Sequence, residues 1–544
     1  MVPSERQDPP SLSQAETLVG EHQASGIHDK GPYPCLTVLY HPDMTRVGER
    51  AILGGLALRK PAILSRLQPK FAPPGEVAGR SLRDPFLSRR PVHISYVDED
   101  QIEIAPEAGV ALEVDEQPID GAAVVSVTAL ERGLYLTLAH RVVLLLHLVP
   151  LRSQYPPAWN LVGDSEAILG VREQITRVGD VDVTVLIRGE TGVGKERVAQ
   201  ALHSASRRRE RELVAVNMAT IPAGTAASEL FGHLRGAFTN ATANHRGLFE
   251  RANGSTLFLD EVGEAPPQVQ TMLLRTLAEG IIRPLGAHRD QPVDVRVLAA
   301  TDTDLEQAGE EGGFRSALKY RLAGYEIYVP PLRARREDIP RLAVHFLAQE
   351  LAQLGEADRM CPPETRRKLW FPPELMLRLV QHDWPGNVRQ LRNTVRQLVI
   401  SGRGADTLRA DAAVERLLAE PTVSARRTWA KRNWLDDTVE EARAEGLGTH
   451  GLSEETLLAA LRAAEWMPSK AAEALGIPRA TLYDLMERTP GVRKAGDIPR
   501  EELERCYRDC DGDLDAMMEQ LQVSKRSLQL RLRRLGIRAA ATKR

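Results

Sequence analysis

A glycine-rich stretch, "GETGVGKE", carries the residues of the chain best suited to phosphate chemistry. It follows an apolar segment, "VDVTVLI", and precedes a stretch with the periodicity of a helix. Glycines let backbone N–H groups point at phosphate oxygens, the helix N-terminus favours their negative charge, and Lys195 would neutralise the β- and γ-phosphates. The spacing predicts a nucleotide-binding loop formed by Gly189, Glu190, Thr191, Gly192, Val193, Gly194, Lys195 and Glu196.

The last position of this loop is unusual, because the pattern normally places Ser or Thr there to hold magnesium, and here it is Glu196. A second motif, "STLFLDEVGE", ends an apolar strand in Asp260 and Glu261. Asp260 could hold Mg²⁺, and Glu261 could polarise a water for attack on the γ-phosphate of ATP. An acidic pair after a strand is weak evidence alone, but downstream of a phosphate loop it indicates ATP hydrolysis. The alternative, a glycine-rich turn with a chance lysine, is disfavoured for the same reason.

The pattern of expected strands, helices and turns along the chain predicts a multidomain protein, whose elements position these residues. Strands and helices alternate over residues 161–400 and become helical from about 335, which predicts an α/β core with a helical subdomain. Short strands separated by turns over 33–150 predict an N-terminal β-sandwich. We expect residues 1–32 to be a disordered tail and 401–450 to be a linker.

The last hundred residues contain an internal repeat, "LGIPRATLYDLMER" and "LQVSKRSLQLRLRR". Each copy follows a helical stretch, so we expect two small helical units in tandem, at 451–490 and 498–544.

Composition sets limits on the location and the partners of the chain. The formal net charge is −3, so any nucleic-acid surface must be local. The polar N-terminus is no signal peptide, the longest apolar run is too short to span a membrane, and the four cysteines are scattered. These features predict a cytoplasmic protein in a reducing compartment.

Several motifs occur in one order: "GETGVGKE", "ASELFGHLRGAFTNA", "GSTLFLDEVGEAP", "VDVRVLAATDTDLE", "FRSALKYRL", "VPPLRARREDIPRLAVHFL" and "WPGNVRQLRN". Together they closely resemble the AAA+ domain of the bacterial enhancer-binding proteins, which activate sigma-54 RNA polymerase. In that family Glu is usual at the position of Glu196. The resemblance implies ATP and Mg²⁺ as cofactors, and a hexameric ring with sites between subunits.

The same resemblance assigns roles to single residues. Asn217 would restrain Glu261 between nucleotide states, and Arg389 would sense the nucleotide from the helical subdomain. Arg315 and Arg321 would be arginine fingers that reach a neighbour's ATP, where a guanidinium stabilises charge on the phosphoryl group.

The family contacts sigma-54 through a Gly-Ala-Phe-Thr-Gly-Ala loop, which here reads "GAFTNA". The contact residues Phe238 and Thr239 are retained, while Asn240 replaces a glycine. Asn tolerates the left-handed backbone better than most residues, so the loop can keep its path. A second departure is Asp302, where the family usually has Asn; its carboxylate either faces the γ-phosphate or faces away.

The stretch "SKAAEALGIPRATLYDLMER" resembles the Fis-type helix-turn-helix that ends this family. Arg479, Thr481 and Tyr483 lie early in its second helix, which would enter the major groove of double-stranded DNA. The second unit is strongly basic, with phosphate contacts expected from Lys525, Arg526 and Arg531. The alternative for either unit is a helical hairpin used for dimerisation.

The N-terminal region carries "DPFLSRRPVHISY" and resembles a forkhead-associated (FHA) domain. The resemblance implies a phosphopeptide site at Arg50, Ser88 and Arg89, and a phosphoprotein partner. A purely structural or protein–protein role is the alternative.

We therefore predict a cytoplasmic, ATP-hydrolysing activator that remodels sigma-54 RNA polymerase and binds DNA upstream of promoters. The rival is a DNA-binding AAA+ regulator that no longer engages sigma-54, which Asn240 and Asp302 favour.

Overall fold

A computed structural model describes residues 32–76, 78–98, 100–152, 154–239, 241–310, 313–360, 368–419 and 500–510, together with 517, 520 and 521. The chain divides into two compact units, the first made of 1–96 and 102–431, the second of 97–101 and 432–544. Predictions that fall on Asn240, the tail at 1–31, the linker from 420 and the helix-turn-helix residues lie outside the described residues. No helix in the described part of the chain is long and apolar enough to cross a membrane.

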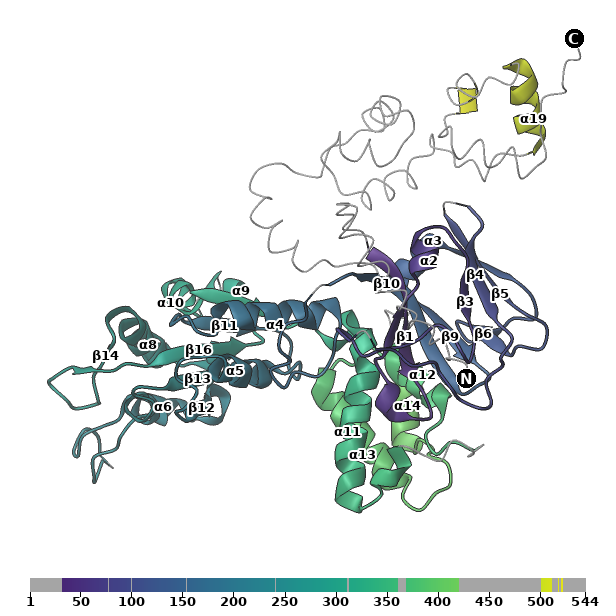
Figure 1. Cartoon of the computed structure of the whole chain (residues 1–544). Coiled ribbons are helices and arrows are strands. Elements are labelled where there is room, and N and C mark those ends of the chain that lie inside the picture. The colour runs from purple at the N-terminus through teal and green to yellow at the C-terminus, as the bar shows by residue number, and fades with distance from the viewer. Residues whose placement is uncertain are drawn as a thin grey trace, which may run out of the picture. The chain divides into compact units, whose positions relative to one another are not determined.

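Two antiparallel sheets form the N-terminal region (Figure 1). The larger sheet has the order β2-β1-β10-β9-β6-β7, with bounds β2 (Arg50–Ile52), β1 (Pro32–Tyr40), β10 (Val142–Pro150), β9 (Leu134–Leu138), β6 (Leu112–Val114) and β7 (Gln117–Pro118). The smaller sheet has the order β3 (Ala62–Leu64), β4 (Val92–Tyr96), β5 (Gln101–Pro106) and β8 (Ala123–Ser126). Apolar side chains of β1, β10, β4 and β5 share one buried core. The short helices here are η1 (Met44–Arg46), α2 (Gly54–Ala57) and α3 (Val127–Arg132).

The central part is an α/β fold, as the alternation of strands and helices predicts. Its five strands are parallel, in the order β12 (Leu213–Asn217), β13 (Thr256–Asp260), β16 (Arg296–Thr301), β11 (Val185–Arg188) and β17 (Tyr325–Tyr328). Separate apolar clusters cover the two faces of the sheet. Because strands in such a sheet run the same way, their carboxyl ends meet at one edge, where ligands bind in open α/β folds.

The helices of this core are α4 (Glu166–Val178), α5 (Lys195–Ser204), η2 (Met218–Thr220), α6 (Ala223–Phe231), α7 (Leu248–Arg251), η3 (Val262–Glu264), α8 (Pro267–Glu279), α9 (Leu305–Glu310) and α10 (Ser316–Leu322). A short hairpin, β14 (Ile281–Ile282) with β15 (Gln291–Pro292), follows α8.

A helical subdomain follows the sheet, made of η4 (Leu332–Ala334), η5 (Arg336–Asp338), α11 (Ile339–Leu354), η6 (Ala357–Met360), α12 (Pro373–Gln381), α13 (Asn387–Ser401) and α14 (Ala412–Ala419). Its helices pack around Trp384, which is fully buried and donates its indole N–H to the Leu379 carbonyl at 2.8 Å. In the second unit the described residues include helix α19 (Arg500–Asp509).

Candidate nucleotide site between the core and the helical subdomain

The predicted phosphate loop connects β11 to α5 and has the backbone that its glycines allow. Gly189, Gly192 and Gly194 have φ values of 151°, 80° and 110°, a region that favours glycine. A Cβ on Gly189 would lie 2.7 Å from the Val329 carbonyl oxygen, and one on Gly192 would lie 2.5 Å from the Gly386 carbonyl oxygen. Both conformation and space therefore require glycine in this loop.

Lys195 begins α5 and is almost completely buried. Its ammonium group donates to the Gly189 carbonyl at 2.9 Å and lies 3.4 Å from Glu261 Oε1. The structure thus brings together the lysine of the phosphate loop and the carboxylate predicted to activate water. Glu196, the next residue, is exposed and accepts from Gln200 Nε2 at 3.2 Å.

The acidic pair lies at the carboxyl end of β13. Burial raises the pKa of Asp260, and Lys195 acts against this rise. Burial likewise raises the pKa of Glu261, again opposed by Lys195. Glu261 itself has φ of 51°, and its Oε2 accepts from the Asp302 N–H at 3.3 Å.

Asn217 does not contact Glu261 in this structure, in contrast to the pairing that the resemblance implies. Its amide donates to Asp260 Oδ2 at 3.3 Å, because β12 and β13 are parallel neighbours and place Asn217 directly beside Asp260. The amide oxygen of Asn217 accepts from the Ala219 N–H at 2.9 Å, which fixes the orientation of the side chain.

Asp302 faces the phosphate loop. Its Oδ2 accepts a hydrogen bond from the hydroxyl of Thr191. Burial raises the pKa of Asp302, but the bond from Thr191 and the charge of Lys195 outweigh this effect, so the pKa is lowered and the carboxylate stays ionised. Asp302, which replaces the usual Asn of the family, therefore links the phosphate loop to the end of β16 by a hydrogen bond.

The helical subdomain closes against the loop at the start of α13. The Arg389 N–H donates to the Gly192 carbonyl at 3.3 Å, and the Arg389 side chain is exposed beside the loop. Asn387 is fully buried, and its amide donates to Glu190 Oε2 and to the Thr191 carbonyl, each at 3.1 Å.

Arg333 approaches Glu190 from the segment between the sheet and α11. Its guanidinium donates to both carboxylate oxygens of Glu190, to Oε2 at 2.8 Å, and this bond lowers the pKa of Glu190. Sequence reasoning missed Arg333 and Asn387 as partners of the loop. Two features of the sequence could have pointed to them. Arg333 lies in the motif "PPLRARRED", and Asn387 lies in "WPGN", two residues before the predicted Arg389.

Arg315 and Arg321 lie at the two ends of α10, and both are exposed. The Arg315 backbone N–H donates to Gln270 Oε1 at 2.9 Å, which fixes the start of the helix. Their exposure leaves both guanidinium groups accessible to a second molecule.

The loop that resembles the sigma-54 contact loop follows α6. Phe238 is 44% exposed, and its ring packs edge-on against His233 with 4.9 Å between centroids. Backbone bonds close the loop base, from the Ala241 N–H to the Phe238 carbonyl at 2.9 Å and from the Gly236 N–H to the Ala241 carbonyl at 2.8 Å. Thr239 is exposed at its tip.

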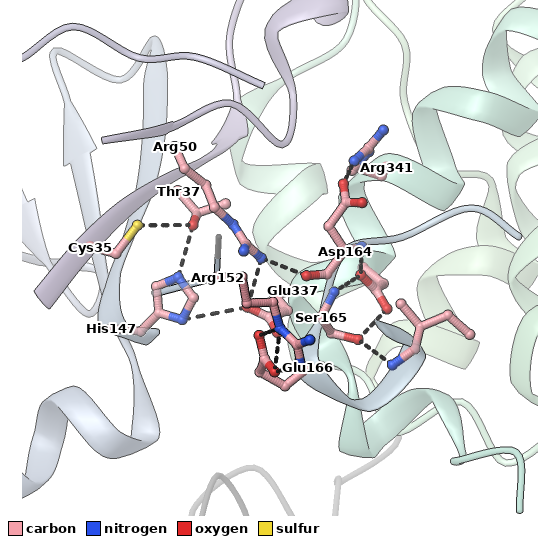
Figure 2. Close-up of polar contacts among 12 residues, drawn as sticks. Cys35, Thr37, Arg50, His147, Arg152, Asp164, Ser165, Glu166, Glu337 and Arg341 are labelled. Carbon is pink, nitrogen blue, oxygen red and sulfur yellow. Dashed lines mark hydrogen bonds and ion pairs between the residues drawn. The ribbon is translucent and has the colours of Figure 1, made fainter. Parts of the chain in front are cut away.

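The three predicted phosphopeptide residues are placed differently from one another. Arg50 is half-buried, with its side chain 11% exposed, and its Nη2 lies 3.7 Å from Glu337 Oε2 (Figure 2). Ser88 is half-buried, with its hydroxyl accepting from the Arg90 N–H at 3.0 Å, while Arg89 is exposed.

Comparisons with known proteins match three parts of the chain. Residues 161–328 match the sigma-54 interaction domain, 333–428 the AAA+ ATPase lid domain, and 453–488 the Fis family of bacterial regulatory proteins. The chain is 42% identical over 336 residues to the DNA-binding transcriptional regulator NtrC of Escherichia coli (strain K12), covering 60% of this chain and 69% of that protein. It is 39% identical over 350 residues to the nitric oxide reductase transcription regulator NorR1 of Cupriavidus necator, covering 60% and 63%.

Among solved structures, NtrX from Brucella abortus in complex with ATP is 32% identical with a TM-score of 0.42, covering 61% of this chain and 69% of that chain. The sequence matches decide the assignment: the chain is an AAA+ ATPase with a Fis-type helix-turn-helix, and it belongs to the family of sigma-54-dependent transcriptional activators.

Proposed function

We propose that this activator hydrolyses ATP within a ring of subunits to remodel closed complexes of sigma-54 RNA polymerase. The observation that carries the proposal is the convergence of Lys195, Asp260 and Glu261 at one sheet edge, with Lys195 Nζ 3.4 Å from Glu261 Oε1. A buried cation beside carboxylates at the carboxyl end of a parallel strand suits phosphoryl transfer from ATP to water. In this proposal Glu261 orients the water, and Lys195 moves from Gly189 and Glu261 to the phosphates.

We further propose that Asp260 holds the Mg²⁺ ion. Its carboxylate ends strand β13, at the sheet edge where Lys195 of the phosphate loop also lies. Within the described ranges, no group of three or more His, Cys, Asp or Glu side chains is placed to hold a metal ion. Mg²⁺ usually binds through one or two carboxylates together with substrate phosphates. When bound, the ion would neutralise charge that develops on the phosphate oxygens.

The ring is proposed from the two exposed arginines of α10. Arg315 and Arg321 are both accessible, and an arginine supplied across an interface is a recurrent way to stabilise the transition state of phosphoryl transfer. A hexamer that places α10 of one subunit at the ATP of the next would make hydrolysis depend on assembly.

The exposed Phe238 and Thr239 are the proposed contacts with sigma-54. Phe238 presents an aromatic surface, and the loop base is held by the backbone bonds of Gly236 and Ala241. Asn240 departs from the family pattern in this loop. It therefore favours the alternative function, a DNA-binding AAA+ regulator that does not engage sigma-54.

The remaining parts are proposed from the sequence. Helix-turn-helix units at 451–490 and 498–544 would bind double-stranded DNA upstream of the promoter. The two N-terminal sheets, which share one core, support an FHA-like β-sandwich over 33–150. A phosphoprotein partner is proposed from the sequence resemblance alone. We propose a cytoplasmic location, where transcription takes place. The AAA+ domain expected over 161–400 extends further, because α14 of the helical subdomain lies at Ala412–Ala419, within the stretch expected to be a linker.

Two measurements on purified protein test the proposal: ATP hydrolysis, and open-complex formation by sigma-54 polymerase on promoter DNA. The proposal requires both activities to depend on Lys195. Hydrolysis without open-complex formation would favour the rival.

A further inference from the structure

Helix α19, in the second compact unit, carries two cysteines one helical turn apart (Figure 1). Cys506 is 3% exposed and Cys510 is half-buried, and neither is in a disulfide. The Cys510 N–H donates to the Cys506 carbonyl at 2.9 Å, so the turn between them is α-helical. Residues four apart on a helix lie on the same face, and the two sulfur atoms are accordingly 3.9 Å apart.

A third polar atom points at this pair of thiols from another segment of the chain. Gln520 Oε1 accepts from Cys506 Sγ at 3.5 Å and from Cys510 Sγ at 3.1 Å. The two sulfurs and the amide oxygen thus form a triangle with sides of 3.9, 3.5 and 3.1 Å. Three atoms that can each bind a metal ion therefore converge on one point.

Buried apolar side chains flank the triangle on both segments. Leu503 is fully buried three residues before Cys506, and Met517 and Leu521 are buried on either side of Gln520. Packing of these neighbours holds the segments that carry the three polar atoms, as the supporting shell of a binding site must.

The pair of thiols is poorly placed to form a disulfide. Cβ atoms four residues apart on a helix are about 5–6 Å from each other. A disulfide needs them about 3.5–4.5 Å apart. Closing the bond would therefore distort the turn of α19 between Cys506 and Cys510, and it would remove both thiol donors from Gln520 Oε1.

A tetrahedral metal ion fits the triangle without such distortion. With Zn–S bonds of about 2.3 Å, tetrahedral angles place two sulfurs about 3.8 Å apart, close to the observed 3.9 Å. With a Zn–O bond of about 2.1 Å, each sulfur would lie about 3.6 Å from the oxygen. The Cys506 sulfur already has this distance, and the Cys510 sulfur is about 0.5 Å closer. Two ligands four residues apart on a helix also hold zinc in His-x3-His sites.

We propose that Cys506, Cys510 and Gln520 form a site for a thiophilic divalent cation, with Zn²⁺ as the ion that fits best and water as its fourth ligand. The thiols release their protons when the ion binds, and the two thiolates neutralise its double charge. The ion fastens α19 to the segment that carries Gln520, within the C-terminal unit expected at 498–544. Metal binding here requires neither ATP hydrolysis nor contact with sigma-54 polymerase.

The test uses the reduced full chain, stripped of metal with a chelator and titrated with Co²⁺ as a coloured substitute for Zn²⁺. We expect one Co²⁺ per chain to give a cobalt–thiolate charge-transfer band together with the visible bands of tetrahedral Co²⁺. Addition of Zn²⁺ should remove both by displacement. The competition also gives the affinity of the site for Zn²⁺.

Three variants each remove one ligand. Even an outer partner of a metal ligand contributes about 10- to 100-fold to affinity. Cys506→Ser and Cys510→Ser should therefore weaken Zn²⁺ binding by about 100-fold or more, and Gln520→Ala, which removes the weaker oxygen ligand, by about tenfold. The control Cys35→Ser makes the same change at a fully buried cysteine of β1 and should leave the affinity unchanged.

A second measurement uses only the wild-type chain, so it does not depend on the folding of a variant. Alkylation of each cysteine by iodoacetamide is followed by mass spectrometry, with and without Zn²⁺. At ten times its dissociation constant, Zn²⁺ leaves about one tenth of the sites free, so alkylation of the half-buried Cys510 should slow by about tenfold. Cys35 should keep its rate.

Co²⁺ binding without a thiolate band would overturn the site, and so would wild-type affinity in both serine variants of α19. Wild-type affinity in Gln520→Ala would overturn the set of three ligands. Unchanged alkylation of Cys510 in excess Zn²⁺ would mean that the two thiols only share a hydrogen-bond acceptor and hold no metal.

Discussion

Replacing Glu337 with glutamine should change the way the stability of its contact with the N-terminal sheet depends on pH. Burial raises the pKa of Glu337 from 4.5 to about 7, and the Arg50 charge acts against this rise without cancelling it. The protonated carboxyl is therefore favoured in the folded state. Its contribution to stability is fully present below pH 4.5 and is lost as the pH rises through about 7.

The size of this loss follows from the pKa of Glu337 in the folded and unfolded chain. A tenfold difference in proton affinity corresponds to about 1.4 kcal/mol, so the wild type should lose about 3 kcal/mol relative to Glu337→Gln over this window. His147 acts in the opposite sense: burial, followed by Arg50, lowers its pKa from 6.5 to about 3, so its contribution is present above pH 6.5 and is lost toward pH 3. His147 Nδ1 lies 3.4 Å from Glu337 Oε2, so the difference between the two proteins reports the change at Glu337 together with its effect on His147.

The assay is thermal unfolding of wild type and Glu337→Gln, measured at intervals from pH 4.5 to 8. The difference between their midpoints should move in favour of the variant as the pH rises, with most of the change between pH 5 and 7. Glu107→Gln, whose side chain is exposed, serves as the control and should follow the wild type at every pH. Parallel curves for wild type and Glu337→Gln would refute the reasoning that folding desolvates Glu337 and favours its protonated form.

Three further predictions concern the site and its support. Glu261→Gln should still bind ATP but hydrolyse it roughly 10²- to 10⁴-fold more slowly, the usual contribution of a general base; a rate near that of the wild type would exclude Glu261 from that role. Arg321→Ala should lose hydrolysis by roughly 10³-fold or more and regain part of it when mixed with Lys195→Ala subunits, because the intact arginine of one chain can serve the intact site of the other. No recovery in such mixtures, measured by phosphate release, would argue against sites shared between subunits. Trp384→Ala should destabilise the helical subdomain by about 3 to 5 kcal/mol through the cavity it leaves, measured by urea unfolding; a change below about 1 kcal/mol would mean that the site refills.

The phosphate loop, the parallel core and the helical subdomain could be predicted from the sequence because their signals are local. Glycines at fixed spacing, apolar strands and helical periodicity each act over a few neighbouring residues. The lysine and the acidic pair meet because strands β11 and β13 end at the same edge of the sheet.

The long-range pairings could not be predicted. Glu190 is 143 residues from Arg333 and 197 from Asn387, and no local pattern links them. Asn217 contacts Asp260, not Glu261, because of the register of β12 beside β13, which the sequence does not reveal. Arg50 matched a phosphate-binding pattern by spacing, yet its guanidinium faces Glu337, because the N-terminal sheet packs on the segment before α11.

The central claim is that ATP turnover at Lys195 drives sigma-54 polymerase, and open-complex formation in vitro on a pre-melted promoter tests it most directly. Sigma-54 polymerase and ATP would be combined with wild type, Lys195→Ala or Asn240→Gly. We predict open complexes with the wild type and with Asn240→Gly, and none with Lys195→Ala. Activity in Asn240→Gly alone would mean that the ATPase is intact and that Asn240 has weakened the contact loop. Hydrolysis of ATP by the wild type without open complexes in any of the three would contradict the claim and favour a DNA-binding regulator that does not engage sigma-54.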